Sequence, residues 1–277
     1  MAYQEYGDAA GEPVIFCHGW PSSRLMGAAF HDAARELGLR IISPDRPGLG
    51  LSQFQPGRTI LDWPRVLTEF ANALGIRRYR ILGISGGAPY AYAAAWARPD
   101  DVRAVCVACG VPPLAELETT EGMRAIYVWM LRIHRGSPAA IRLLLRMARP
   151  FVRMPFFKAF KIAVLPFLEP ADRAAMNRGA GFEICFESNR AAWEKSAGGV
   201  ALDGELYSRP WGFPVDEVRV PVRIWHGKKD TSFSWKLSEE MARRIPGSVS
   251  TFPDDDGHYS LPLMHARGIL EDLKNAG

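Results

Sequence analysis

The sequence predicts an α/β fold with a mostly parallel sheet, on the basis of three observations. Short apolar runs bounded by turn residues recur along the chain, with helix-like stretches between them. The runs are nearly continuous in apolar residues, as expected for parallel strands that are covered on both faces. The strand pattern stops between about residues 111 and 218, where helical periodicity continues, and then resumes. We therefore expect an α/β body at 1–112 and 219–277, interrupted by a helical cap at 113–218.

The expected elements of the body alternate along the chain. The strands are predicted at residues 14–18, 40–44, 79–84, 102–108, 220–225 and 249–252. The helices are predicted at residues 22–37, 59–74, 88–97, 237–245 and 264–274. In the second helix, Asp62 is a candidate N-cap and Pro64 lies just inside the first turn. This alternation is typical of an open α/β sheet with helices on both faces.

Composition excludes several classes of protein. The chain has 277 residues, of which 48% are hydrophobic and 23% charged, so it is neither disordered nor fibrous nor a small disulfide scaffold. Its 34 basic and 30 acidic residues give a net charge of +4, which is too small an excess to indicate nucleic-acid binding. The N-terminus lacks the pattern of a signal peptide, and no apolar run is long enough for a transmembrane helix.

The four cysteines are predicted to be free thiols. Cys106 and Cys109 form a CxxC pattern, but it lies inside an apolar strand-like run. A redox CxxC opens a helix, and a zinc site needs a second pair of ligands, and neither feature accompanies this pattern. Together with Cys17 and Cys185, these residues therefore indicate a reducing, cytoplasmic setting.

A candidate nucleophile lies between the third predicted strand and an Ala-rich predicted helix. The segment Gly83-Ile84-Ser85-Gly86-Gly87 contains the pattern G-x-S-x-G. A serine on such a tight strand-to-helix turn exposes its hydroxyl at the carboxyl edge of the sheet, and small neighbours make room for a strained backbone. We therefore expect Ser85 to be a nucleophile, although an ordinary Gly-rich turn would show the same letters.

Two backbone N–H groups are the candidates for an oxyanion hole. Gly86 directly follows the candidate nucleophile at a helix N-terminus, so its N–H can point at a developing oxyanion. The second donor should come from the loop after the first strong strand, His18-Gly19-Trp20-Pro21. Because Pro21 has no N–H, Trp20 is the expected donor. His18 is expected to shape this loop by a local hydrogen bond.

A serine nucleophile needs a base, and the base needs a carboxylate. His258 follows the last predicted strand and so lies at the same sheet edge as Ser85, whereas His31, His226 and His265 are expected to be structural. Asp230, in the loop after strand 220–225, is the favoured carboxylate. Asp256 stays a rival, but it stands only two residues from His258, a poor spacing for bonding the inner ring nitrogen.

These segments together resemble the α/β-hydrolase superfamily, in particular its members with a helical cap. They occur in the family's order over nearly the whole chain: His18-Gly19-Trp20, the segment from Asp45 to Ser52, the segment from Gly83 to Gly87, the segment from Gly227 to Asp230, and Gly257-His258. The resemblance implies Ser85 as nucleophile, Asp230 as acid, His258 as base, and Trp20 and Gly86 as oxyanion donors.

The resemblance also carries exclusions and one departure. Epoxide hydrolases and dehalogenases of this fold carry Asp at the elbow, so Ser85 argues against both activities. The resemblance implies no cofactor and no metal, and the sequence holds no HExxH, paired CxxC or phosphate loop. Asp45 belongs to a structural turn in the family. The usual first strand is missing, because residues 2–7 resemble the family's second strand, which could leave an exposed sheet edge.

The predicted cap carries an asymmetric charge. Residues 122–168 hold nine basic and no acidic residues, so the remaining 25 basic and 30 acidic residues have a net charge of −5. Arg142, Arg146 and Arg149 fall on one stripe of an otherwise apolar helix. They could attract an anionic substrate or give weak contact with a membrane surface, or they could be solvated residues of a helix packed on the body or on a second subunit.

The sequence predicts a cofactor-independent serine hydrolase of a small-to-medium apolar carboxylic ester, acting through an acyl-enzyme. Two other functions remain open: a C–C bond hydrolase or lyase that uses the same residues for proton transfer, and a non-catalytic ligand receptor on the same fold. The expected partner is a small apolar molecule, and the oligomeric state is left open.

Overall fold

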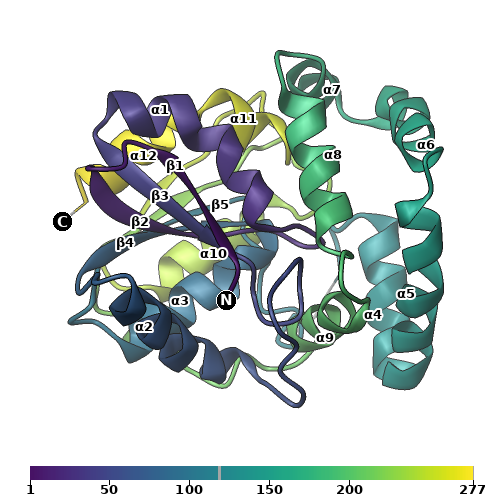
Figure 1. Cartoon of the computed structure of the whole chain (residues 1–277), viewed down its shortest axis with the longest axis horizontal. Helices are drawn as coiled ribbons and strands as arrows, with labels where there is room; N and C mark the ends of the chain where they lie inside the picture. The colour runs from purple at the N-terminus through teal and green to yellow at the C-terminus, as the bar shows by residue number, and fades with distance from the viewer. Residues whose placement is uncertain (118–119, 277) are drawn as a thin grey trace.

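The computed structural model describes residues 1–117 and 120–276, and a seven-stranded sheet lies at its centre (Figure 1). The strand order is β1-β3-β2-β4-β5-β6-β7. Only β1 runs antiparallel to its neighbour, so the predicted mostly parallel α/β sheet is confirmed. The strands are β1 (Tyr3–Gly7), β2 (Glu12–Cys17), β3 (Leu39–Pro44), β4 (Tyr79–Ile84), β5 (Val102–Ala108), β6 (Val222–Trp225) and β7 (Val249–Thr251).

Strand β1 forms one edge of this sheet, as the departure at residues 2–7 implied. It pairs with β3 from Tyr3 opposite Pro44 to Gly7 opposite Arg40. The Arg40 guanidinium donates two hydrogen bonds, of 2.6 and 2.8 Å, to the Glu5 carboxylate across the two strands. Charged side chains on an edge strand discourage pairing with another sheet, so this edge is protected.

Helices of the body cover both faces of the sheet (Figure 1). Aliphatic residues on alternate strand positions pack against α1 and α12 on one face and against α2 and α3 on the other. The body helices are α1 (His31–Glu36), α2 (Trp63–Ala73), α3 (Ala88–Ala97), α10 (Trp235–Arg244), α11 (Ser260–Met264) and α12 (Ala266–Lys274). This arrangement buries the apolar runs from which the strands were predicted.

Three details of the expected helices differ in the structure. The predicted helix 22–37 begins as a 3-10 helix, η1 (Arg24–Phe30), and only then continues as α1. The predicted helix 264–274 is divided into α11 and α12 by a break at His265. Asp62 precedes α2, but its carboxylate accepts from the N–H and hydroxyl of Thr59 and so closes a capping box one turn earlier.

The region between β5 and β6 is helical and lies to one side of the sheet (Figure 1). Its helices are α4 (Ala125–Gly136), α5 (Pro138–Arg153), α6 (Phe157–Val164), α7 (Pro170–Met176), α8 (Gly181–Ala191) and α9 (Gly198–Tyr207). We refer to these six helices as the cap helices. The boundary of the cap at 113–218 stays a prediction, and its residues 118 and 119, like residue 277 of the body, lie outside the described part of the chain.

Helix α9 contacts two loops of the body at close range. A Cβ atom on Gly199 would lie 2.2 Å from the carbonyl carbon and oxygen of Gly48, so only glycine permits this contact. The indole N–H of Trp20 donates a 2.8 Å hydrogen bond to the carbonyl of Val200, and the Trp20 ring packs over Gly204. These contacts place α9 directly over the loop that follows β2.

Candidate active site

Ser85 stands on a sharp turn between β4 and α3. Its φ angle is +50°, in the left-handed region that a residue with a side chain rarely adopts. A Cβ on Gly87 would lie 1.9 Å from the carbonyl oxygen of Cys17, and a Cβ on Gly83 would lie 3.0 Å from the Cβ of Ala91. The glycines therefore allow the turn to pack tightly, and the strained turn holds the Ser85 side chain at the carboxyl edge of the sheet.

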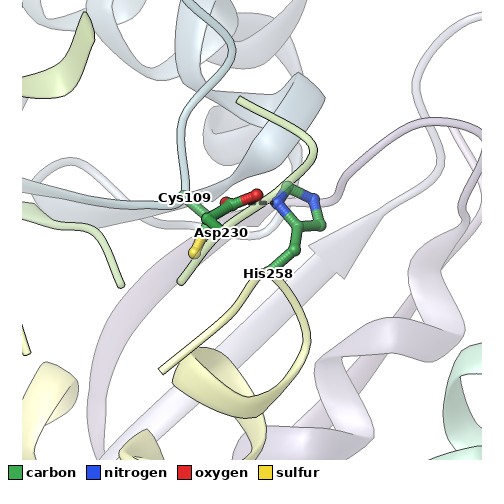
Figure 2. Close-up of side chains that lie close together, drawn as sticks. All are labelled: Cys109, Asp230 and His258. Carbon is green, nitrogen blue, oxygen red and sulfur yellow. Dashed lines mark hydrogen bonds and ion pairs between the residues drawn. The ribbon is translucent and has the colours of Figure 1, made fainter. Parts of the chain in front are cut away.

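His258 and Asp230 reach Ser85 from two other loops at the same edge. The Nε2 atom of His258 lies 3.0 Å from Ser85 Oγ, and its Nδ1 atom lies 2.7 Å from Asp230 Oδ2. Figure 2 shows the His258 ring directed at the Asp230 carboxylate. All three side chains are buried. The pattern is consistent with a proton on Nδ1 that is donated to Asp230, which leaves Nε2 free to accept the Ser85 proton.

The electrostatics of this pair suit a proton acceptor. Burial alone would raise the pKa of Asp230, but His258 and the hydrogen bonds around the carboxylate outweigh burial and hold that pKa well below its usual range. Burial alone would lower the pKa of His258, but the charge of Asp230 outweighs it and raises that pKa above its ordinary value. A base with a raised pKa, next to a permanently ionised carboxylate, can take up the proton of the serine hydroxyl.

Asp230 accepts more hydrogen bonds than the sequence indicated. Its Oδ1 atom accepts from the backbone N–H groups of Ser232 (2.7 Å) and Phe233 (3.2 Å). His226 Nε2 lies 2.9 Å from Oδ2, while His226 Nδ1 lies 2.6 Å from the Ser238 hydroxyl. His226, expected only to shape its turn, therefore also fixes the carboxylate. No local motif carries this role, because it depends on where α10 packs.

The loop of His258 is held by a carboxylate from the cap helices. Asp172 of α7 accepts hydrogen bonds from the backbone N–H groups of His258 (3.2 Å), Tyr259 (2.9 Å) and Ser260 (2.8 Å). A Cβ on Gly257 would lie 2.4 Å from an Asp172 oxygen, so this close approach requires glycine. A cap helix therefore positions the loop of His258, and no local pattern in the sequence indicates this contact.

The rival residues have other partners. Asp256 Oδ2 lies 2.8 Å from His265 Nε2, so this carboxylate is directed at His265 and not at His258. His18 Nδ1 lies 3.0 Å from the carbonyl of Gly19 within its own loop, and His31 Nδ1 accepts the N–H of Gly7 at 3.0 Å.

Asp45 has a structural environment in the turn after β3. It accepts from the backbone N–H groups of Arg24 (2.6 Å) and Leu51 (3.0 Å), and it forms an ion pair with the Arg24 guanidinium. A Cβ on Gly50, whose φ is +53°, would lie 2.1 Å from an Asp45 oxygen. The segment therefore builds a turn and contributes no group to Ser85.

The two candidate oxyanion donors lie side by side at Ser85. A Cβ on Gly86 would lie 2.9 Å from the Cβ of Trp20, and a Cβ on Gly19 would lie 3.4 Å from that of Ser85. Among the backbone hydrogen bonds that lie outside helices and strands in residues 1–117 and 120–276, none uses the N–H of Trp20 or of Gly86. Both donors are thus available to an oxygen bound next to Ser85.

A buried ionic network lies beneath this loop. The Arg46 guanidinium donates to the carbonyls of His18 and Gly19 (2.9 Å) and to Asp203 of α9 (2.9 Å). Arg58 pairs with the other oxygen of Asp203. Burial alone would raise the pKa of Asp203, but the two guanidinium groups outweigh burial and lower this pKa to about 2.

Two tyrosines complete the network. The Tyr90 hydroxyl donates to Asp203 at 2.8 Å, and the Tyr207 hydroxyl of α9 donates to the carbonyl of Gly86 at 2.9 Å. The Arg46 guanidinium also lies over the Tyr90 ring, 4.6 Å from its centre. Because two buried cations share one buried carboxylate, the network has one uncompensated positive charge next to the two oxyanion donors.

Two cavities meet at Ser85 and share Trp20 and Tyr127 in their walls. The smaller, of about 50 Å³, is lined mainly by apolar side chains, with His134 at its wall. Burial lowers the pKa of His134, so this chamber is uncharged at neutral pH. The larger, of about 290 Å³, lies on the other side under α6 and α8, and Lys161 is the basic group in its wall besides His258.

Cys109 lies beside this site and forms a group of metal-type donors with Asp230 and His258 (Figure 2). Burial raises the pKa of the Cys109 thiol well above its ordinary value, whereas a metal needs the thiolate. The Asp230 carboxylate and both nitrogens of His258 already take part in hydrogen bonds with protein groups. This donor set suits proton transfer and does not fit a metal ion.

The basic stripe of the cap mainly holds the cap helices together. Arg142 pairs with Glu205 of α9 at 2.8 Å, and Arg149 donates to the carbonyls of Trp193 (2.9 Å) and Glu194 (2.8 Å) at the end of α8. Lys158 of α6 pairs with Glu183 of α8. Arg142 and Arg149 therefore bind other residues of the cap, a role that differs from the solvated arginines that the sequence offered as the alternative to a ligand.

Comparison with known families gives a match over most of the chain. A model of a family described as alpha/beta hydrolase fold matches residues 12–263. Among curated proteins, a segment of 100 residues is 35% identical to haloalkane dehalogenase 2 of Mycobacterium tuberculosis and covers 35% of each chain. A segment of 103 residues is 34% identical to an epoxide hydrolase of Caballeronia sordidicola and covers 35% of this chain and 30% of that one. The match thus spans about a third of the length of these relatives.

Solved structures resemble the chain over nearly its whole length. A thermophilic esterase from Thermogutta terrifontis, in a malate-bound form, has a TM-score of 0.71 at 23% identity and covers 99% of this chain and 93% of its own. An enol-lactonase from Burkholderia xenovorans has a TM-score of 0.70 at 18% identity, with 99% and 96% covered. At these identities the likeness concerns the fold.

The buried network gives a prediction for stability. Asp203→Asn removes the carboxylate from two buried guanidinium groups, and we expect a loss of about 3–5 kcal/mol in the free energy of unfolding, because an unpaired buried charge is costly. Urea denaturation measures this loss. Glu69→Gln, which breaks the exposed pair with Arg65, is the control and should cost less than about 1 kcal/mol. Equal losses in the two variants would contradict the role of the network.

Proposed function

Because the chain belongs to the α/β-hydrolase fold family, we propose that it is a serine hydrolase that cleaves a carboxylic ester through an acyl-enzyme. Ser85 is the nucleophile, His258 the base and Asp230 the acid that orients it. The observation that carries the proposal is the buried line of hydrogen bonds from Ser85 through His258 to Asp230, with lengths of 3.0 and 2.7 Å. In addition, Ser85 stands on a strained turn with a positive φ angle, as a nucleophile elbow requires.

The proposed reaction has two symmetric halves. His258 Nε2 takes the Ser85 proton as Oγ attacks the ester carbonyl, and the oxyanion that forms is held by the N–H groups of Trp20 and Gly86. His258 then gives the proton to the departing alcohol, which leaves an ester of Ser85. Water, activated by the same imidazole, attacks this ester and releases the acid and free Ser85.

The two cavities support an ester substrate. They extend from Ser85 in different directions, so one can hold the acyl part and the other the alcohol part of the same molecule. Apolar residues predominate in the smaller cavity, which suits the small-to-medium apolar group that the sequence predicted. No cofactor is needed in this reaction, because every proton transfer is made by His258.

The named relatives suggest other activities on this fold, namely dehalogenation and epoxide hydrolysis. Family members with these activities carry Asp at the elbow, where this chain has Ser85. A serine that depends on a neighbouring base suits attack on a carbonyl carbon. C–C bond hydrolysis or a lyase reaction, and a receptor without turnover, remain as alternatives that the labelling experiment below separates from ester hydrolysis.

The outer surface of the cap supports weak contact with an anionic membrane surface. Apolar side chains that are 39–80% exposed gather between residues 126 and 167: Ile126, Trp129, Leu143, Leu144, Met147, Phe151, Met154, Phe156, Phe160, Ile162 and Phe167. Figure 1 shows α5 and α6, which carry most of them, on the side of the cap away from the sheet. This stretch has no acidic residue, so its charge opposes a second copy of the same face and suits anionic lipid. No helix in the described part of the chain could cross a membrane.

Ser85→Ala should abolish ester turnover, with a fall of about 10⁴-fold or more in kcat, because the atom that attacks is removed. The measurement uses p-nitrophenyl esters of increasing chain length and intact-mass detection of a phosphonate probe on Ser85. Ser248→Ala, on the far side of the body, is the control and should keep both turnover and labelling.

The outcomes of this experiment separate the alternatives. An acyl-enzyme that accumulates with a slow ester supports ester hydrolysis. Turnover without an acyl-enzyme would favour C–C bond or lyase chemistry, and an unlabelled Ser85 would favour a receptor. Turnover retained in Ser85→Ala would overturn the assignment of the nucleophile.

The pH profile should report the raised pKa of His258. The base must be neutral to act, so kcat/KM should fall as the pH decreases through an inflection above about 6.5, the ordinary value for histidine. Asp230→Asn removes the charge that raises this pKa, so the inflection should move to lower pH while kcat falls. Asp256→Asn is the matched control and should leave the inflection unchanged. An inflection that moves equally in both variants would show that Asp230 has no special link to His258.

Membrane contact is tested by co-sedimentation with vesicles. The protein should bind vesicles of phosphatidylcholine with one quarter phosphatidylglycerol more tightly than pure phosphatidylcholine, and salt should weaken the binding. Phe160→Ser together with Phe167→Ser should reduce it several-fold, because two exposed apolar contacts are lost. Leu61→Ser, an exposed apolar site on the body, is the control. Equal binding to both vesicles, or a dimer that the double variant dissociates, would refute lipid contact.

A further inference from the structure

Lys161 differs from the other cations of the cap by its position. It lies on α6 and, together with Ser85 and His258, lines the larger cavity. Most of the neighbouring wall is apolar and comes from Val164, Leu165 and the side chains of α8. A cationic group thus stands inside the cavity in which the reaction is proposed to occur.

Lys161 also lacks an anionic partner. Among the hydrogen bonds and ion pairs between residues 1–117 and 120–276, none involves its ammonium group. Its nearest recorded neighbours are the Phe157 ring, whose centre is 5.5 Å from Nζ, and the Cys185 thiol. Burial raises the pKa of that thiol to about 12, so it is neutral at physiological pH and supplies no counter-charge.

Lys158, on the same helix, differs from Lys161 in having an anionic partner. Lys158, one turn earlier, is exposed and pairs with Glu183, and Arg142 pairs with Glu205. Burial lowers the pKa of Lys161, which shows that the surrounding groups do not compensate for the loss of water around its charge. Lys161 is half-buried, and an ammonium group in a largely apolar wall without an anionic partner is less favourable than one in water, so a ligand anion would supply the missing partner.

We propose that Lys161 binds a carboxylate of the substrate, so that the enzyme prefers esters that carry a second, anionic group. This inference rests on the proposed function and narrows its substrate class to monoesters of dicarboxylic acids and closely related anionic esters. The ester carbonyl lies at Ser85, the uncharged group enters the smaller chamber, and the carboxylate lies in the larger one. It differs from the predicted small-to-medium apolar ester in giving one end of the molecule a negative charge.

The test compares anionic and neutral esters of matched length. The anionic series is the mono-p-nitrophenyl esters of succinate, glutarate and adipate, and the neutral series is the p-nitrophenyl alkanoates of the same chain lengths. We expect at least one anionic ester to have a higher kcat/KM than its neutral match. Lys161→Met should then lower kcat/KM for that ester by about 10- to 100-fold, mainly through KM, and leave the neutral ester unchanged or improved.

Lys158→Met is the matched control, because it removes a lysine from the same helix without reaching the cavity. It should leave the ratio of anionic to neutral kcat/KM unchanged. The inference is overturned if Lys161→Met lowers both series equally, or if it leaves that ratio as it is in the parent protein. A loss in both series would indicate a packing role for the lysine stem.

A binding measurement keeps this inference separate from the proposed function. Calorimetry with glutarate on the Ser85→Ala variant should detect binding that Lys161→Met, added to the same chain, weakens by about tenfold or more. Glutarate that binds through Lys161 while no ester is hydrolysed would support the subsite and overturn the esterase assignment. Hydrolysis of neutral esters with no effect of Lys161 in either measurement would support the esterase and overturn the subsite.

Discussion

The structure depends on one buried carboxylate, Asp203, held between the guanidinium groups of Arg46 and Arg58. Asp203 belongs to the cap helix α9, whereas both arginines belong to the body. Each arginine is fully desolvated, so neither can be left without the carboxylate at tolerable cost. Since Arg46 also holds the carbonyls of His18 and Gly19, a single interaction fixes both the docking of the cap and the shape of the loop that carries a candidate oxyanion donor.

Cap residues also hold the other loops around Ser85 by buried hydrogen bonds. The Tyr207 hydroxyl of α9 holds the carbonyl of Gly86, and Asp172 of α7 holds the backbone at His258. Hydrogen bonds from the cap therefore reach both the elbow and the loop of the base. A cap built in this way is part of the active-site framework, because displacement of α7 or α9 would leave buried polar groups unsatisfied. Helices α5 and α6 make no hydrogen bond to the elbow or to the loop of His258 among those of the described residues, and they act instead as walls of the two cavities, through Ile141 and Lys161.

This division explains what the sequence could predict. Ser85 and His258 can be predicted as candidates because a tight strand-to-helix turn and a strand-end loop are local patterns. The sheet can be predicted because buried parallel strands are continuously apolar. Asp203 and Arg46 stand 157 residues apart, and their pairing depends on how α9 packs. His226 was assigned to its turn because nothing in its own segment shows that the Asp230 carboxylate lies beside it. Residues that come together only through tertiary packing have no characteristic spacing in the sequence, so their contact cannot be predicted from it.

The basic residues of the cap illustrate best how little a sequence pattern says about contacts made by tertiary packing. The sequence shows nine cations in one stretch of the cap, but most of them pair with carboxylates or bind carbonyls at helix ends, so their number says little about a ligand. What matters is where charge is left uncompensated. That occurs at the Arg46 network beside the oxyanion donors and at Lys161 in the larger cavity. In the proposed reaction, the first lies where negative charge would develop during ester cleavage, and the second lies where a permanent negative charge could be held away from the reacting carbonyl. The proposed anionic ester would therefore place both of its negative charges next to positive ones, whereas a neutral ester would leave Lys161 without an anionic partner.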